Sequence, residues 1–521
     1  MYEIPPYRRF SRKRRPNRPK KKPSFPPACD SDMTFQECEL AVLRQAIDEI
    51  ESNAKNTNVN SEEVGQMIAI VEKFLQDTQC ICYGGTAINN ILPEESQFYD
   101  RSIEIPDYDF FSKTPVEHAK KLADIFYREG YTEVEAKAGT HYGTYKVFVN
   151  FIPMADITLL HEDLFDNLKA DAIMVDQVLY TPPNFLRMSM FLELSRPNGD
   201  VSRWEKVLKR LTLLNQHYPL KGHDCHKIDF QRSMETKTRD ESESLYYLIR
   251  DTFIAQRVVF FGGYASSLYA KYMPSDRKRF AKTIPDFDVL SEDAHLCATI
   301  VVQSLQDAGY TKTKIVAHDA IGEVIPARYE ILVDKETLAF VYEPIACHNY
   351  NEIHVDGQSI RVATIDTILS FYLAFLYAND VFHTDYKDRL LCMSQYLFDV
   401  EQKNRLNQMG VLKRFSLSCY GKQPTLETIR AEKAEMFRKL KKKRGMQWDR
   451  WFLKYNPREM GTKRTKKSPV DVNELKKGQT KNGQTKKEKP KKEQLKRGRK
   501  TRAKAQKWRI PLQKKSDFLF S

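Results

Sequence analysis

The stretch CYGGTAINNIL, residues 82–92, joins a short apolar run to a pair of glycines and then to a helix-forming run. Because Gly84 and Gly85 have no side chains, backbone N–H groups at such a turn can approach a ligand closely. The first turn of the following helix adds N–H groups that suit phosphate. The stretch predicts a strand, a phosphate-binding turn and a helix, with Gly84, Gly85 and Thr86 at the ligand.

A second motif follows at PDYDFF, residues 106–111. In a strand, side chains two residues apart share a face about 7 Å apart, so Asp107 and Asp109 should point together. Divalent cations such as Mg²⁺ prefer oxygen ligands and keep positions open for phosphates. Asp156, in MADIT, lies between apolar residues where an unpaired charge is costly. We expect Asp107, Asp109 and Asp156 to form a two-metal catalytic site.

Both motifs occur again in the second half of the chain, as FFGGYASSLYA at 260–270 and PDFDVL at 285–290. The spacing from glycine to first aspartate is 23 residues from Gly84 and 24 residues from Gly262. Gly-Tyr-Thr follows the second aspartate by 21 residues in both halves. This self-similarity predicts a duplicated α+β unit of domain size.

The second copy differs at the third acid. The strand that corresponds to MADIT is LAFVYEP, which places Val341 or a neighbour where Asp156 stands. Asp286 and Asp288 remain, but we expect the second unit to be inactive. The alternative is that Asp334 or Glu336 supplies the third carboxylate from a shifted strand.

The pattern of two glycines, Asp-x-Asp and a third Asp resembles the nucleotidyltransferase superfamily of DNA polymerase β, poly(A) polymerases and CCA-adding enzymes. The segments at 82–93, 103–112 and 181–220 narrow this to a resemblance to poly(A) polymerase catalytic subunits of large DNA viruses, the poxvirus, asfarvirus and giant-virus kind. The segment at 93–105 makes the gap between glycines and aspartates longer than the superfamily usually shows.

The resemblance implies duplicated polymerase-β-like units and template-independent polyadenylation in viral mRNA processing. AMP would pass from ATP to an RNA 3′ end with Mg²⁺ or Mn²⁺ and release of pyrophosphate. It covers roughly residues 35–440. Two alternatives stay open: another RNA nucleotidyltransferase of the uridylyl- or CCA-adding type, and a non-catalytic RNA-binding processivity scaffold.

Polar and basic side chains near the motifs are further candidates for nucleotide binding. Arg203, Lys206 and Arg210 recur at helical spacing after Asp200, so they form a stripe that could neutralise a triphosphate. One amide of Asn89 and Asn90 could contact the nucleotide or primer. The alternative for each set is an ordinary solvated or polar helix position.

Charge separates the ends of the chain from its centre. Residues 1–22 carry a net charge of +9 and residues 461–521 carry +17, which leaves −11 on the residues between them. Segments so rich in lysine and poor in large aliphatics cannot bury enough surface to fold. We expect them either to bind polyanions without reading sequence or to serve as solubility or nuclear-import tails. We predict a disordered basic arm at 1–34, an active domain at 35–225, a second domain at 226–445 and a disordered basic tail at 446–521.

No apolar run approaches the length of a membrane span, so we expect no membrane association. The nine cysteines have no CxxC pair, which favours free thiols in a reducing compartment. With the resemblance, this places the protein in the host-cell cytoplasm, with packaging in the virion and nuclear targeting by the tails both open. Expected partners are the RNA primer and ATP, and a homodimer or a processivity subunit is also open.

Overall fold

The computed structural model describes residues 33–46, 62–99, 108–228, 239–272, 285–378 and 386–459. All of them lie in the first of the two units into which the chain divides, residues 1–465. Asp107 lies outside the described residues. So do the parts of the two predicted basic segments that precede residue 33 or follow residue 459.

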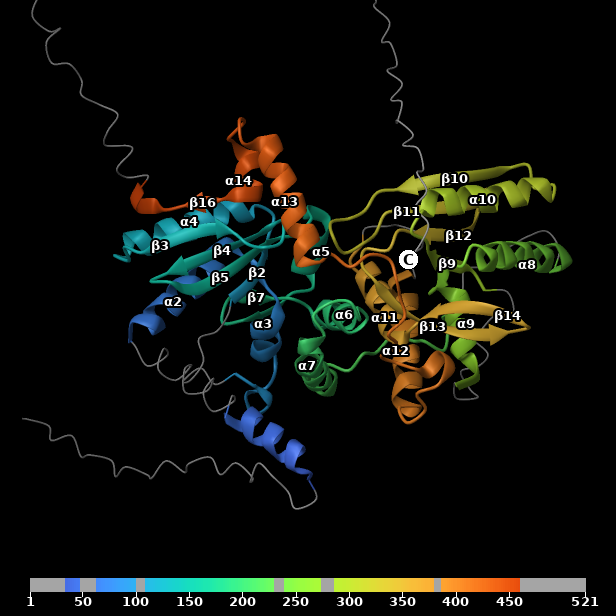
Figure 1. Cartoon of the computed structure of the whole chain (residues 1–521), viewed down its shortest axis with the longest axis horizontal. Coiled ribbons are helices and arrows are strands. Elements are labelled where there is room, and N and C mark those ends of the chain that lie inside the picture. Colours follow the sequence, from blue (N-terminus) through green and yellow to red (C-terminus); the bar gives the residue numbers. More distant parts are fainter. Residues whose placement is uncertain are drawn as a thin grey trace, which may run out of the picture. The chain divides into compact units, whose positions relative to one another are not determined.

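The first sheet has eight strands in the order β16-β3-β4-β5-β2-β1-β7-β6. Helices α2 and α4 pack against it, and Figure 1 shows both beside these strands. The strands are β1 Ile81–Cys82, β2 Tyr108–Ser112, β3 Val134–Ala138, β4 Thr144–Val149, β5 Ile152–Leu159, β6 Ile173–Val175, β7 Val178–Tyr180 and β16 Lys454–Tyr455. The helices of this half are α2 Glu62–Thr78, α3 Gly84–Ile91, α4 Pro115–Arg128, α5 Glu162–Ala170, α6 Pro183–Leu194 and α7 Trp204–His217.

The second sheet repeats this order as β10-β11-β12-β9-β8-β14-β13-β15. Its strands are β8 Val259–Phe260, β9 Phe287–Leu290, β10 Thr313–His318, β11 Arg328–Val333, β12 Glu336–Tyr342, β13 His348–Val355, β14 Gln358–Ala363 and β15 Cys419–Tyr420. The remaining helices are α8 Arg239–Ala255, α9 Gly263–Tyr269, α10 Ala294–Asp307, α11 Ile365–Phe375, α12 Tyr386–Lys403, α13 Leu426–Leu440 and α14 Met446–Phe452.

The duplication predicted from the two motifs is confirmed. It extends beyond those motifs to most strands of each sheet. Seven strands correspond one to one, from β3 with β10 through β6 with β13. The inner pairings also agree, since β1 runs antiparallel to β2 and parallel to β7, as β8 does to β9 and β14. The expected α+β fold class is therefore correct.

Local sequence explains the elements that carry the site. Helix α4 begins with Pro115 in its first turn and stops before Gly130, whose φ of +101° suits glycine. Its buried residues recur at helical spacing. Strand β4 alternates, with Tyr145, Val147 and Val149 buried toward α4. The other face of β4 is left free of α4 and carries Lys146.

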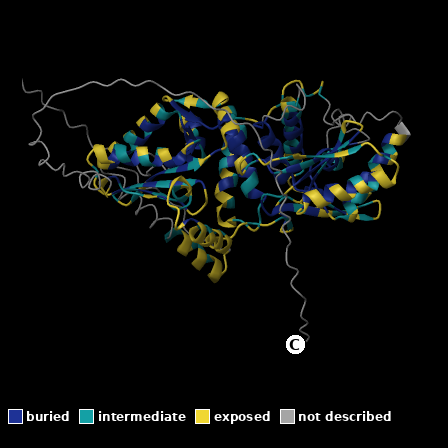
Figure 2. Ribbon diagram, turned by 90° about the horizontal axis from the view of Figure 1, so that it is seen from above, coloured by how far each residue is buried: buried dark blue, intermediate teal, exposed yellow. Residues whose placement is uncertain are grey.

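The two halves meet through the helices that follow their central strands. Helix α6 follows β7 and packs against α11, which follows β14, and Figure 1 places the two side by side. Phe185 of α6 contacts Tyr377 edge to face, with ring centroids 5.3 Å apart. Buried residues fill the sheets and the inward helix faces, whereas exposed residues follow the outer helix surfaces (Figure 2).

The structure differs from the expected segment boundaries near the C-terminus. Residues from 446 onward were expected to be a disordered tail, yet Met446–Phe452 is a helix and Lys454–Tyr455 is a strand paired with β3. Helix α13 was expected in the second domain, but Lys433 donates to the Gly139 carbonyl in the first half at 2.5 Å. Five of the eight residues of MQWDRWFL, 446–453, are apolar, so this segment has the side chains to pack that the lysine-rich sequence after it lacks.

The expectation of free thiols is also wrong. Cys225 is bonded to Cys392 and Cys347 to Cys419, across 167 and 72 residues of sequence. Sequence spacing does not reveal such pairs, because the fold alone brings their Cα atoms to 5.4 and 5.2 Å. Cys80, Cys82 and Cys297 are buried free thiols. No described helix has the length and apolar character to cross a bilayer.

Candidate active site

The glycine turn closes directly onto the Asp-x-Asp strand. Strand β1 ends at Cys82, the Tyr83 N–H donates to the Asp109 carbonyl at 2.9 Å, and α3 begins at Gly84. Gly84 has a φ of +73°, and a Cβ there would lie 2.8 Å from Asp109 Oδ2. Only glycine allows this approach. The start of α3 has no side-chain cap, so the Tyr83 side chain does not compete with a ligand for the N–H groups of the first turn.

Two of the three predicted carboxylates lie side by side. Strands β2 and β5 run parallel, and the register pairs Asp109 directly with Asp156. Paired residues on neighbouring strands share a face and are about 4.8 Å apart. The Asp156 side chain is 14% exposed and forms an ion pair with Lys146 of β4. Asp107 precedes β2 and lies outside the described residues.

The chemistry of this pair fits a divalent cation. Asp156 Oδ1 is buried and has no hydrogen-bond partner among the described residues. A buried carboxylate oxygen is costly unless something pairs with it. Within the described ranges, no three carboxylate, imidazole or thiolate groups converge. The set is therefore two oxygen ligands, to which the predicted Asp107 would add a third.

Of the predicted basic stripe, Arg210 reaches the glycine turn. Both of its terminal nitrogens lie 2.9 Å from where a Cβ of Gly85 would be, and Nη2 donates to Tyr99 Oη at 2.6 Å. The guanidinium also lies over the Phe98 ring, 5.0 Å from its centroid. Arg203 instead pairs with Glu193 at 3.3 Å, and Lys206 is exposed on α7. The structure thus brings one of the three to the site.

The predicted polar residues of α3 are buried and bonded within the fold. Asn89 accepts hydrogen bonds from the N–H groups of Phe98 and Tyr99, both at 2.8 Å, and so holds the loop that presents Tyr99. Asn90 donates to Tyr180 Oη at 2.8 Å. Thr86 is 3% exposed. A nucleotide contact from any of them stays a prediction.

Sequence reasoning missed Lys146 and Tyr99. Lys146 has the right strand parity to face Asp156, but only the β4–β5 register pairs the two. Tyr99 lies in the inserted segment that lengthens the gap before Asp107. The Tyr99 side chain contacts Arg210 and holds it at the glycine turn, which gives the insertion a structural role.

The second unit keeps the turn and replaces the third acid. The β9–β12 register pairs Asp288 with Phe340, where Asp109 has Asp156, so the expected "Val341 or a neighbour" is Phe340. Asp334 is in a turn and forms an ion pair with Lys312 at 3.1 Å. Glu336 lies at the far end of β12, where the strand register sets it opposite Val333. Neither fills the third position. The carboxyl groups of Asp286 and Asp288 occupy the space where side chains of Gly263 and Gly262 would lie.

Comparison with known proteins agrees with this architecture. Residues 69–200 match the family model described as "Poly(A) polymerase catalytic subunit". A protein of Acanthamoeba polyphaga mimivirus, named a candidate poly(A) polymerase catalytic subunit, is 29% identical over 42% of this chain and 38% of its own. A protein of the same name from African swine fever virus isolate Tick/Malawi is 29% identical over 32% and 36%. The matches thus span well under half of these relatives.

A solved structure extends the likeness of fold to most of the chain. The crystal structure of the Megavirus polyadenylate synthase superposes with a TM-score of 0.66 at 21% identity, over 83% of this chain and 89% of that one. The family model and the relatives therefore bear out the resemblance drawn from the sequence motifs, and the solved structure adds a likeness of fold.

Proposed function

We propose that the chain is the catalytic subunit of a poly(A) polymerase, which transfers AMP from ATP to an RNA 3′ end without a template. The pairing of Asp109 with Asp156 beside the Gly84 turn carries this proposal. The family match over residues 69–200 supports it, because that segment contains the glycine turn, β2 and β5.

In the reaction, the RNA 3′ hydroxyl attacks the α-phosphorus of ATP, and the bond to pyrophosphate breaks. Two Mg²⁺ or Mn²⁺ ions held by Asp109, Asp156 and Asp107 would supply the positive charge that favours the alkoxide and the leaving pyrophosphate. The N–H groups at the start of α3 donate to phosphate oxygens. Arg210, fixed by Tyr99, offsets phosphate charge beside Gly85.

Lys146 has a positioning role in this scheme. Its ammonium group holds one oxygen of Asp156, and this leaves the buried Oδ1 as the oxygen for a cation. The second unit, with Phe340 at the third position, would add structure but no chemistry. The expected ligands are the RNA 3′ end and ATP. The host-cell cytoplasm stays a prediction from the resemblance alone, because the disulfides remove the argument from free thiols. Virion packaging and a dimer or processivity subunit stay predictions.

The test is extension of a labelled RNA primer with each NTP offered alone, for the wild type, Asp109→Ala, Asp156→Asn and Asp288→Ala. We expect a long ladder with ATP only, with a loss of at least 100-fold in rate for the two first-unit variants, because each removes ligand charge from the reacting phosphate. Asp288→Ala should keep its activity. Extension with UTP or CTP would indicate a sister transferase, and activity in Asp109→Ala would refute the assigned site.

A further inference from the structure

A row of directly opposed residues crosses the first sheet toward the carboxylates. The registers pair Lys454 with Lys137, Lys137 with Lys146, Lys146 with Asp156, and Asp156 with Asp109. Directly paired residues point to one face, here the face opposite to α4. Three lysines on β16, β3 and β4 therefore lead to the candidate site. Lys454 and Asp156 are three strand spacings apart, about 14 Å.

Like charges placed directly opposite each other destabilise a sheet. Glu135 lies 3.4 Å from Lys137, and Asp156 pairs with Lys146. These two carboxylates pair with two of the three lysines, Lys137 and Lys146, so the positive excess lies at the Lys454 end of the row. A bound polyanion would relieve that repulsion.

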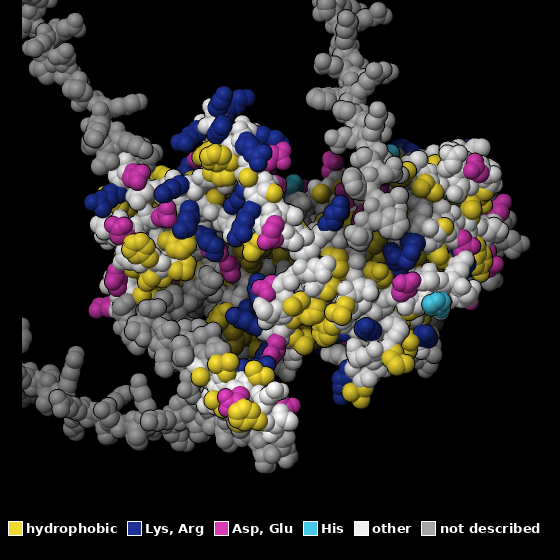
Figure 3. Space-filling model, in the orientation of Figure 1, with side chains coloured by type: hydrophobic (Ala, Val, Ile, Leu, Met, Phe, Trp, Pro, Cys, Tyr) yellow, Lys and Arg dark blue, Asp and Glu magenta, His cyan; other side chains and the backbone are white. Residues whose placement is uncertain are grey.

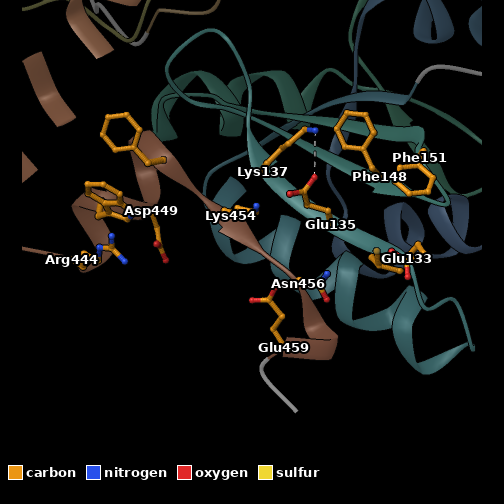
Figure 4. Close-up of a pocket in the computed structure, with 13 residues that line it drawn as sticks. Glu133, Glu135, Lys137, Phe148, Phe151, Arg444, Asp449, Lys454, Asn456 and Glu459 are labelled. Atoms are coloured by element: carbon orange, nitrogen blue, oxygen red, sulfur yellow. Dashed lines mark ion pairs between the residues drawn. The ribbon is translucent and has the colours of Figure 1, made fainter. Parts of the chain in front are cut away.

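A groove of about 820 Å³ opens beside the Lys454 end of the row (Figure 4). Aromatic side chains line it, among them Phe148, Phe151 and Trp448. Lys137 Nζ lies over the Phe148 ring, 4.0 Å from its centroid. Four carboxylates also line the groove. Asp449 pairs with Lys120, Glu133 with Arg458 and Glu135 with Lys137, and the fourth is Glu459.

Phe151 is placed in this groove at a conformational cost. It is 85% exposed and has a φ of +66°, in the two-residue turn between β4 and β5 that begins with Asn150 at +49°. Such turns favour Asn-Gly, and a bulky residue at positive φ is an outlier. Gln177 and Lys335 have the same conformation in two other hairpin turns, so what distinguishes Phe151 is its exposed aromatic ring.

The connection from α13 to α14 adds further positive charge. Six of the seven residues at 438–444, RKLKKKR, are basic, and residues 441–444 are exposed. Figure 3 shows Lys and Arg side chains gathered over α13 and α14 around a hydrophobic patch. The Arg444 guanidinium lies over Trp448, 5.1 Å from the ring centroid. Aromatic faces among basic side chains are what a single-stranded nucleic acid requires.

We propose that Lys137, Phe148, Phe151, Arg444, Trp448 and Lys454 form an RNA track. The track binds single-stranded RNA upstream of its 3′ end, with bases on the aromatic rings and phosphates on the lysines and arginine. The row then leads the 3′ end past Lys146 to Asp156 and Asp109. The direction of the strand rests on the proposed function, whereas RNA binding by the track does not.

The charge of the track is tested by the anisotropy of a labelled single-stranded oligo(A) of about 15 nucleotides at several NaCl concentrations. The full-length variant Lys137→Ala/Arg444→Ala/Lys454→Ala is compared with Lys312→Ala/Lys314→Ala/Lys335→Ala, three exposed lysines of the second half. The track variant should bind about tenfold more weakly, and its slope of log affinity against log salt should fall by about 2. Equal affinities and slopes in the two variants would overturn the track.

The aromatic contribution is tested by Phe151→Gly. This change removes the ring and restores the Asn-Gly sequence that the turn prefers, so the melting temperature should not fall. Affinity for oligo(A) should nevertheless drop about tenfold, with little change for duplex RNA. An unchanged oligo(A) affinity, or an equal loss for duplex, would refute stacking of single-stranded bases here.

These tests separate the track from the proposed function. Loss of oligo(A) affinity in the track variants, in a protein that incorporates no NTP, would leave the track standing and remove the polymerase. Polymerisation with ATP, combined with track variants that bind like the control, would remove the track alone.

Discussion

The protonation state of Glu401 depends on a balance of buried charges. Arg414 donates to both oxygens of Asp366, which is fully buried, and pairs with Glu401 Oε1 at 2.8 Å. Burial and the Asp366 charge raise the pKa of Glu401 to about 8, against the lowering effect of Arg414. One guanidinium cannot neutralise two buried carboxylates, so Glu401 favours its protonated form in the folded protein.

This predicts a pH dependence of stability. The unfolded carboxyl titrates near 4.5 and the folded one near 8, so the stabilisation is complete below pH 4.5 and is lost as the pH rises through 8. The melting temperature of the wild type should fall by about 2 °C or more between pH 6 and pH 9. The fall should be smaller in Glu401→Gln, which stays neutral. Parallel curves for the two proteins, measured by differential scanning fluorimetry, would contradict the raised pKa.

At the scale of elements, the buried Arg187 of α6 fixes α7, the helix that carries Arg210. Arg187 of α6 is 1% exposed and donates Nε to Asn215 Oδ1 of α7 at 2.7 Å. Its other nitrogens donate to Asn184 Oδ1 and the Tyr218 carbonyl. Burial lowers its pKa to about 10, so it remains charged at neutral pH. The guanidinium thus joins the start of α6 to the end of the helix that carries Arg210.

We expect Arg187→Met to lower the free energy of unfolding by about 3 kcal/mol or more. Methionine fills much of the volume but leaves three half-buried acceptors without their donor, each costing about 1 kcal/mol or more. Arg203→Met is the matched control, since it removes a 57% exposed arginine with one ion pair and should cost under about 1 kcal/mol. Urea denaturation measures both, and similar losses in the two variants would argue against the linking role of Arg187.

For the whole molecule, the duplicated sheets are joined by contacts and by covalent bonds that cross long stretches of sequence. The bond from Cys225 to Cys392 connects the segment after α7 with α12, and that from Cys347 to Cys419 connects the start of β13 with β15. A crosslink stabilises mainly by restricting the unfolded chain, and more so for long loops. The first bond therefore has the larger expected effect.

Replacement of the first bond by Cys225→Ser/Cys392→Ser should destabilise the protein by about 5 kcal/mol in the loop-entropy model. The apparent melting temperature should fall accordingly. Mass spectrometry of a non-reduced digest should find the Cys225 and Cys392 peptides joined. Cys297→Ser, which changes a buried free thiol, is the single-site comparison. Absence of the joined peptide and an unchanged melting temperature would together show that the bond does not form.

Sequence by itself determined the features that depend on local pattern. Repeated spacings around Gly84 and Gly262 disclosed the duplication, and the loss of the third acid was placed within one residue of Phe340. Asp109 and Asp156 were both predicted as ligands, and the structure sets them opposite each other, while their catalytic role stays a prediction. Glycine turns, strand alternation and a charge among apolar residues each have a short-range signature. Asp107 stays a prediction from that same pattern.

Tertiary structure decided what depends on register and long-range packing. Lys146 faces Asp156, and Lys454 joins the row with Lys137, only through strand pairings that no spacing encodes. Arg210 alone of its stripe reaches the glycine turn, because the loop with Tyr99 folds back onto α7. The disulfides and the docking of α14 have the same origin. Pairing between distant segments is set by the burial of whole surfaces, and a linear pattern of residues does not specify which surfaces meet.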